Sequence, residues 1–292
     1  MRIAAVAYPC ERLPGWTAQE AKLDALLREA VADLVVFPEY AAMEAALIAG
    51  PQTAGITEWR DLAAERADDW VEQFRHMARK HRCHILAGSG PVATDRGVVN
   101  RSWLIAPDGH VAHQDKRLLL TYEREALGMV PGEELRLFAT ALGRIGLLVC
   151  YDSEFPLQAR ALCEAGAEML LVPSCTDFPA GQTRVRQSCR ARAIENQCLV
   201  VQAPLVGEVS GCDPIDRSTG RAALFCPPDH GLPSDGIIAE GETDRPGAVV
   251  AEVDPAAIAA PRRCGQVVNF ADWPHGLDRV TPVTLSDSAG RV

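Results

Sequence analysis

The sequence has no apolar run long enough to cross a bilayer. A membrane-spanning helix needs roughly 18 or more consecutive apolar residues, and none of the 292 residues belongs to such a run. The start of the chain, from Met1 to Tyr8, is apolar but short, alternates like a strand and leads into Pro9, Cys10 and Glu11. We therefore expect a first strand rather than a signal peptide, and a soluble cytoplasmic protein that does not act at a membrane.

Basic residues are also in short supply. The chain has 29 Lys and Arg against 39 Asp and Glu, which gives a formal charge of −10. A nucleic acid is therefore not an expected partner, because its phosphates would be repelled. Internal repeats and linkers rich in Gly, Ser or Pro are missing as well, and 48% of the residues are hydrophobic. We expect one large domain with a substantial core.

Cysteine is plentiful, but the patterns that would give it a structural role are missing. The ten cysteines include no Cys-x-x-Cys pair and no tight cluster with histidine, which a zinc site would need. A disulfide framework is typical of small secreted domains, and this chain is not small. We therefore expect no metal site, and thiols that are mostly buried and reduced.

Hydrophobic periodicity predicts that strands and helices alternate. Strands are expected at 2–8, 34–37, 84–87, 100–106, 111–113, 145–149, 169–172, 198–202, 222–225 and 248–253. Helices are expected at 21–32 after a capping box from Thr17 to Glu20, and at 57–82, 157–165 and 183–197. From Pro261 the pattern fades into a tail that we expect to be draped over the surface or disordered. Because hairpins and crossovers are mixed, the expected class is α/β, with mixed sheets covered by helices.

Three chemically active side chains follow apolar strand runs. Glu39 comes after 34–37, Lys116 after the hairpin strand 111–113, and Cys150 after 145–149. Ligands tend to bind beyond the carboxyl ends of strands, and a thiol near a helix N-terminus is stabilised as thiolate. Taken alone, each has an ordinary explanation: a solvated glutamate, a surface lysine, a packed thiol. Together they would supply a nucleophile, a general base and a cationic oxyanion stabiliser, and the catalytic hypothesis rests on this combination.

Five segments, in order along the chain, resemble the nitrilase superfamily of carbon–nitrogen hydrolases. They are Val36-Phe37-Pro38-Glu39, Asp115-Lys116-Arg117-Leu118, Tyr122-Glu123-Arg124-Glu125-Ala126-Leu127-Gly128, Val149-Cys150-Tyr151-Asp152-Ser153-Glu154-Phe155-Pro156 and Arg192-Ala193-Ile194-Glu195-Asn196. The resemblance implies a four-layer αββα sandwich, with a single hydrolase domain over residues 1–260 and a C-terminal tail over 261–292. It also implies a homodimer or a higher homo-oligomer.

The same resemblance implies a Cys-Glu-Lys mechanism that needs no metal and no organic cofactor. Cys150 would attack the carbon of a small amide and form a thioester. Glu39 would be the base, and Lys116 would hold the oxyanion together with the backbone N–H of Tyr151. Glu123 would orient Lys116.

The remaining site residues are less sharply defined. Glu125 lies close enough in the sequence to compete with Glu123 for its role. Asp177 could pair with a substrate amine or cap the following helix. The residues beside the strand ends that could line the substrate pocket are Tyr40, Tyr151, Cys175, Thr176 and Asp177.

The leading hypothesis is hydrolysis of a small linear carboxamide. Tyr151 and Asp152 follow the nucleophile where nitrile-hydrolysing members resemble Cys-Trp-Glu, which favours an amidase. A nitrile or an N-carbamoyl substrate on the same residues is a second hypothesis. A catalytically idle binding module is a third, and loss of a catalytic residue would be its sign. A redox sensor is a fourth, and it would need a resolving partner for Cys150, of which Cys163 is the nearest in sequence.

Overall fold

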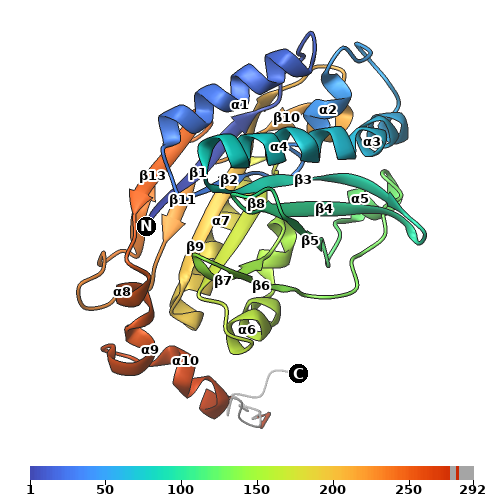
Figure 1. Cartoon of the computed structure of the whole chain (residues 1–292). Helices are drawn as coiled ribbons and strands as arrows, with labels where there is room; N and C mark the ends of the chain where they lie inside the picture. The colour runs from blue at the N-terminus through green and yellow to red at the C-terminus, as the bar shows by residue number, and fades with distance from the viewer. Residues whose placement is uncertain (277–280, 283–292) are drawn as a thin grey trace, which may run out of the picture.

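Two β-sheets form the centre of the computed structural model, which describes residues 1–276 and 281–282 (Figure 1). The first sheet has the strand order β5-β4-β3-β2-β1, and β1 also pairs with β13. β1 runs parallel to β2, and β2 runs parallel to β3, whereas β3, β4 and β5 are joined as hairpins. The strands are β1 (Arg2–Pro9), β2 (Leu34–Phe37), β3 (His84–Thr94), β4 (Gly97–Ile105), β5 (Val111–Asp115) and β13 (Gly247–Glu252).

The second sheet continues the strand order as β9-β8-β7-β6. Among the described residues, it joins the first sheet at the end of β1, where Tyr8 and Pro9 pair with Leu205 and Val206 of β9. β7, β8 and β9 are parallel, and the shorter strands β6, β10, β11 and β12 are antiparallel to their neighbours. The strands are β6 (Leu137–Thr140), β7 (Gly143–Leu147), β8 (Met169–Ser174), β9 (Leu199–Glu208), β10 (Arg217–Ser218), β11 (Ala223–Phe225) and β12 (Ile237–Glu240).

Helices cover the outer face of each sheet. Figure 1 shows α1 and α4 above the first sheet and α6 below the second. The helices are α1 (Trp16–Ala30), α2 (Met43–Leu47), α3 (Ile56–Glu65), α4 (Ala67–His81), α5 (Thr121–Glu125), α6 (Pro156–Glu164), α7 (Pro179–Asn196), α8 (Pro255–Ala259), α9 (Pro261–Cys264) and α10 (Asn269–Asp272). Three 3₁₀ turns are η1 (Cys150–Glu154), η2 (Asp213–Ile215) and η3 (Trp273–Gly276).

Alternating strand residues divide the interior into three cores. In β1, Ala4 and Val6 pack towards α1 and α4, whereas Ile3 and Ala5 pack between the two sheets. In β8, Leu171 faces the space between the sheets, and its neighbours face α6 and α7. Successive side chains of a strand point to opposite faces, so both sheets are buried on both sides. This arrangement is the four-layer αββα sandwich, and it confirms the expected α/β fold.

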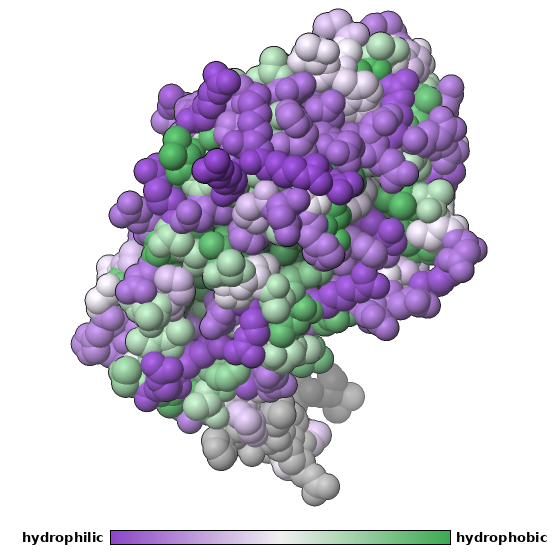
Figure 2. All heavy atoms as spheres, viewed as in Figure 1, coloured by the Kyte–Doolittle hydropathy of each residue, from purple (hydrophilic) through white to green (hydrophobic). Residues whose placement is uncertain are grey.

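The helical cover is built from apolar residues at helical spacing. In α4, Trp70, Phe74 and Met77 are fully buried, and Phe74 lies edge-to-face on Phe37 of β2 with ring centroids 5.0 Å apart. The opposite face of α4 carries charged residues, and Figure 2 shows mainly hydrophilic side chains over the region of α1 and α4. The apolar face of α4 therefore packs this helix directly over β2, the strand that leads to Glu39.

The structure corrects three sequence expectations. The helix expected at 57–82 is two helices, α3 and α4, that break at Arg66, whose guanidinium binds the backbone oxygens of Ala45 and Ile48. The capping box before the first helix is wrong, because α1 begins at Trp16 after Gly15, without a side-chain cap.

Of the two alternatives for the tail, disorder is wrong for residues 261–276, which form α9, α10 and η3. Gln197 at the end of α7 holds this segment through Val267 and Phe270. The rest of the expected tail, 277–280 and 283–292, lies outside the described residues. The domain boundary at residue 260 stays a prediction. Among the described residues, no helix is both long and apolar enough to span a membrane.

Candidate active site

The side chains expected to act together do meet, at the carboxyl ends of strands from both sheets. Glu39 follows β2, Lys116 follows β5, Cys150 follows β7 and begins η1, and Cys175 follows β8. Short apolar strands stop there because the following residues turn away from the ladder. Loops from both sheets thus meet at one edge, which brings together four residues spread over more than a hundred positions.

Lys116 lies between two glutamates. Its Nζ is 2.8 Å from Oε1 of Glu39 and 2.8 Å from Oε2 of Glu123. The three side chains are at most 1% exposed. Glu125, on the same short helix α5, is exposed, so Glu123 is the glutamate that contacts Lys116. The ammonium is therefore fixed in place by two carboxylates rather than by one.

Asn100 ties the two glutamates together. Its Nδ2 donates to Oε1 of Glu39 at 3.0 Å and to Oε1 of Glu123 at 3.2 Å. The hydroxyl of Tyr40 donates to the same oxygen of Glu123 at 2.7 Å. The sequence analysis predicted Asn100 only as the start of a strand and missed this role. A polar residue directly after Val98 and Val99, inside a buried strand, is the signal that could have found it.

Cys150 sits in a strained turn. Its φ is +49°, in the left-handed region that a residue with a side chain adopts at a cost of about 1–3 kcal/mol. Ser153 Oγ donates to the carbonyl of Cys150 at 2.6 Å, and Arg192 of α7 donates to the carbonyl of Ser153 at 3.0 Å. The expected structural helix motif at 192–196 thus supports the turn that carries the thiol.

The backbone of Cys175 contacts both the thiol of Cys150 and the carboxylate of Glu39. Its carbonyl oxygen lies 3.5 Å from Sγ of Cys150, and its N–H donates to Oε2 of Glu39 at 3.0 Å. Its own thiol lies 3.6 Å from Oγ of Ser218. Cys175 therefore contributes main-chain groups to the site, while its side chain packs nearby.

Burial dominates the acid–base properties of the thiol and of its neighbouring carboxylate. Burial raises the pKa of Cys150 well above its ordinary value, and Glu39 raises it further, against the opposing charge of Lys116. Burial also raises the pKa of Glu39, and Lys116 partly offsets this rise. The resting site therefore favours a neutral thiol that must give up its proton when it reacts.

The charges at Lys116 and Glu123 support each other. Burial lowers the pKa of Lys116, but Glu123 and Glu39 outweigh it, so the net shift is well upward. Burial raises the pKa of Glu123, but the ammonium of Lys116 outweighs it, and the net pKa is lowered. This pair is thus held as a cation and an anion, whereas burial disfavours the charged forms of Glu39 and Cys150.

The remaining predicted pocket residues lie around this centre. Tyr151 and Thr176 are half-buried, and the hydroxyl of Thr176 donates to the carbonyl of Thr219 at 2.7 Å. Asp177 is exposed. The alternative that Asp177 caps the next helix is wrong, because α7 is preceded by Phe178 and has no side-chain cap.

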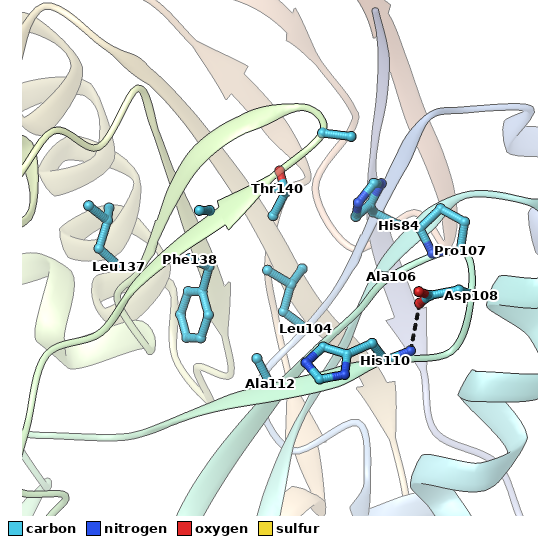
Figure 3. Close-up of a pocket in the computed structure, with 12 residues that line it drawn as sticks. His84, Leu104, Ala106, Pro107, Asp108, His110, Ala112, Leu137, Phe138 and Thr140 are labelled. Atoms are coloured by element: carbon cyan, nitrogen blue, oxygen red, sulfur yellow. Dashed lines mark hydrogen bonds between the residues drawn. The ribbon is translucent and has the colours of Figure 1, made fainter.

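A cavity of about 660 Å³ lies elsewhere, at the opposite end of the strands (Figure 3). His84 begins β3 and pairs with Leu34 at the start of β2, whereas Glu39 follows the end of β2. Figure 3 shows Phe138 on one side of this cavity and His84 and Asp108 on the other. Its lining includes none of the residues around Cys150, so it is separate from the candidate active site.

A metal site was not expected, and a redox role for Cys150 was one of the alternatives. Within residues 1–276 and 281–282, no group of three or more His, Cys, Asp or Glu residues could hold a metal ion. Sγ of Cys163 lies 4.0 Å from Sγ of Cys198, while the thiol of Cys150 points to the carbonyl of Cys175. Cys163, the cysteine nearest to Cys150 in the sequence, therefore gives the redox hypothesis no resolving partner.

Comparison with known proteins agrees with the fold. The sequence matches the carbon–nitrogen hydrolase family model over residues 2–227. The chain belongs to the carbon–nitrogen hydrolase family. The resemblance inferred from the five sequence segments is thereby confirmed.

This carbon–nitrogen hydrolase has relatives among bacterial proteins. It is 30% identical over 244 residues to the probable hydrolase YhcX of Bacillus subtilis (strain 168), which covers 84% of this chain and 47% of YhcX. It is 33% identical over 167 residues to the deaminated glutathione amidase of Yersinia enterocolitica, which covers 53% of this chain and 58% of that protein. The chain spans about half the length of these two relatives.

A solved structure shares the architecture. An amidase of the nitrilase superfamily from Nesterenkonia AN1 superposes with a TM-score of 0.67 and 25% identity, over 90% of this chain and 95% of that chain.

Proposed function

We propose that this carbon–nitrogen hydrolase is an amidase that cleaves a small linear carboxamide through a thioester on Cys150. The observation that carries the proposal is the buried Lys116 ammonium, which lies 2.8 Å from both Glu39 and Glu123 beside the thiol turn. A cation next to a nucleophile and a carboxylate is the arrangement that acyl transfer requires.

In the first step, Cys150 Sγ attacks the amide carbon while Glu39 takes the thiol proton. A base is needed because burial raises the pKa of the thiol and leaves it neutral at rest. The carbonyl oxygen becomes an oxyanion, which Lys116 and the backbone N–H of Tyr151 stabilise. Tyr151 lies in the first turn of η1, where N–H groups have no partner within the helix.

In the second step, the tetrahedral intermediate collapses to a thioester. The carbon–nitrogen bond breaks, and the nitrogen leaves as ammonia or an amine with the proton that Glu39 held. Water then attacks the thioester, and Glu39 takes a proton from the water. The carbon–sulfur bond then breaks, and Glu39 returns this proton to the leaving thiolate of Cys150. The products are a carboxylic acid and the free Cys150 thiol, so atoms and charge balance without a cofactor.

Burial of the reacting groups supports a small substrate. Cys150 is only 3% exposed, and the half-buried residues next to it are Tyr151 and Cys175. The relatives support an amide rather than a nitrile, since the Yersinia relative is a deaminated glutathione amidase and the Nesterenkonia protein is an amidase.

The test is to measure ammonia release from a panel of amides, nitriles and N-carbamoyl compounds, with intact mass spectrometry of the enzyme. We expect wild-type enzyme to release ammonia from amides and to carry an acyl adduct. C150A should lose activity at least about 1,000-fold, because removal of the nucleophile leaves only binding and oxyanion stabilisation.

C175A is the matched control, because Cys175 offers its main chain to the site and should keep most of its activity as alanine. A fully active C150A would overturn the proposal. Activity only on nitriles, or carbon dioxide released together with ammonia, would move it to the nitrilase or N-carbamoyl hypothesis. An inactive wild type with an unreactive Cys150 thiol would favour the binding module.

A homodimer in the cytoplasm is part of the same proposal. Large apolar side chains are exposed around α6 and α7: Leu157 is 71% exposed, Phe178 60% and Ile194 40%. Such a face favours association with a second copy. Light scattering on wild type and on L157E should separate a dimer from a monomer, and a monomeric wild type would contradict this part.

A further inference from the structure

Asp152 connects the turn that carries Cys150 to the loop that carries Lys116. Its side chain is 1% exposed. Oδ1 accepts the N–H of Leu118 at 2.7 Å, and Oδ2 accepts the N–H of Arg117 at 3.3 Å and of Val149 at 3.2 Å. A single buried carboxylate thus binds three main-chain donors from two segments more than thirty residues apart in the sequence.

One of these bonds closes the strained turn. The N–H of Asp152 donates to the carbonyl of Val149 at 3.1 Å, while the N–H of Val149 donates to Oδ2 of Asp152. The two residues therefore exchange two hydrogen bonds across Cys150, whose φ is +49°. A conformation that costs energy persists only where its surroundings determine it, and this pair of bonds is one such restraint, beside the bond from Ser153 Oγ to the carbonyl of Cys150.

The other two bonds fix the distance between nucleophile and cation. Arg117 and Leu118 directly follow Lys116, and the N–H of Lys116 is itself held by the carbonyl of Asn100 at 2.8 Å. Three consecutive main-chain N–H groups, from Lys116 to Leu118, are thus bound to fixed acceptors. The acceptor for the last two belongs to the turn that holds the thiol.

We propose that Asp152 is a positioning residue that keeps Lys116 in register with Cys150, and so sets how reactive the thiol is. Only a carboxylate suits this place, because an asparagine would turn an NH₂ group towards one of three N–H donors. The expected effect on turnover rests on the proposed amidase function, whereas the expected effect on alkylation of the Cys150 thiol does not.

The experiment compares wild type, D152N and D229N. Asp229 is the matched control, because its carboxylate also accepts main-chain N–H groups, from His230 and Gln266, far from Cys150 in the C-terminal part of the fold. Two quantities are measured: kcat and KM on the best amide, and the rate at which iodoacetamide alkylates Cys150, followed by intact mass and peptide mapping.

We expect D152N to lower kcat about 100-fold with KM within about threefold, and to slow Cys150 alkylation about tenfold. D229N should match wild type in both. A purely structural role would lower the melting temperature but leave the alkylation rate of the folded protein unchanged, and that result would overturn the proposal.

Two further outcomes are distinguishable. If wild type turns over no amide, the proposed function fails, yet the alkylation rates still decide the role of Asp152. If D152N does not fold, D152E is measured instead, since a carboxylate shifted by one methylene should also slow alkylation. A wild-type alkylation rate in whichever variant folds would overturn the proposal.

Discussion

Two lysines in this molecule are each held by two glutamates, yet their surroundings differ. Lys116 contacts Glu39 and Glu123 in the candidate active site. Lys22 of α1 contacts Glu44 of α2 at 2.6 Å and Glu11, in the loop after β1, at 2.9 Å. Each cluster also includes a tyrosine hydroxyl bound to a buried glutamate, so composition alone does not tell them apart.

The difference lies in the thiol beside each cluster. Glu44 accepts hydrogen bonds from Lys22, the hydroxyl of Tyr8 and the N–H of Glu11, just as Glu39 accepts three donors, so the number of hydrogen bonds does not separate them. The nearby thiol of Cys10 points to the main-chain oxygens of Tyr40 and Ala41 rather than to a carboxylate. The Lys22 cluster fastens the loop after β1 to α2 and has no poised nucleophile.

The Lys116 cluster, by contrast, lies next to a thiol in a strained turn. Burial and Glu39 raise the pKa of this Cys150 thiol, and the half-buried residues Tyr151 and Cys175 lie beside it. A lysine held by two glutamates therefore contributes to stability in the Lys22 cluster and to the proposed chemistry in the Lys116 cluster. What differs is whether a nucleophile lies beside the carboxylate. Matched substitutions in the two clusters test this difference.

The largest expected effect separates K116M from K22M. K116M should lower kcat at least about 1,000-fold, because it removes the cation that stabilises the oxyanion. K22M should keep activity within about twofold but cost about 2–4 kcal/mol of unfolding free energy, since Glu44 stays buried without its ammonium.

Ammonia release and thermal unfolding of both variants check this prediction. K116M also leaves buried carboxylates uncompensated, so its melting temperature is expected to fall too. The comparison would fail if folded K22M lost as much activity as K116M.

A smaller effect is expected at Asn100. N100A removes two hydrogen bonds to ionised carboxylates, each worth about 1.5–3 kcal/mol, and should lower kcat by about 10- to 100-fold as Glu39 and Glu123 lose their common donor. Asn196 in α7 is the matched control, because it is also buried and its Nδ2 donates to the carbonyl of Arg192 rather than to a carboxylate. An N100A enzyme with wild-type kcat would show that Lys116 alone holds the glutamates.

These residues also mark how far the sequence could predict the structure. That Glu39, Lys116 and Cys150 meet was predictable, because each lies shortly after the end of an expected strand and strand ends gather at a sheet edge. Asn100 was not, because its role depends on two carboxylates that arrive from β2 and α5. The helix break at Arg66 was not either, since the helical pattern continues through it and its cause is a contact with the distant end of α2.

The smallest effect concerns pH, and it separates activity from stability. Burial raises the pKa of Asp152 to about 6 from its ordinary 3.8, against the opposing charge of Lys116. Burial also raises the pKa of Glu39 and, in the Lys22 cluster, of Glu44. For a carboxyl with a raised folded-state pKa, the contribution to stability is present below its unfolded pKa and is lost as pH rises through the folded pKa.

Activity should run the other way, because Asp152 and Glu39 act only when ionised. From pH 7 down to about pH 5, kcat should fall about tenfold, since Asp152 takes up a proton over this range. The melting temperature should hold over the same range, because protonation of these three carboxyls favours the folded state. Glu123, whose pKa is lowered by Lys116 against its burial, loses its stabilising contribution only at pH values below its ordinary 4.5.

Measuring kcat and melting temperature on the same samples tests this separation. If both fell together between pH 7 and pH 5, the loss of activity would be unfolding rather than protonation of the site. The Lys116 cluster would then respond to acid no differently from the Lys22 cluster. If the enzyme is instead stable but slow at pH 5 and recovers fully at pH 7, the loss of activity at low pH comes from protonation of Asp152 and Glu39. These carboxylates are then needed for chemistry and lower the stability of the fold when they ionise.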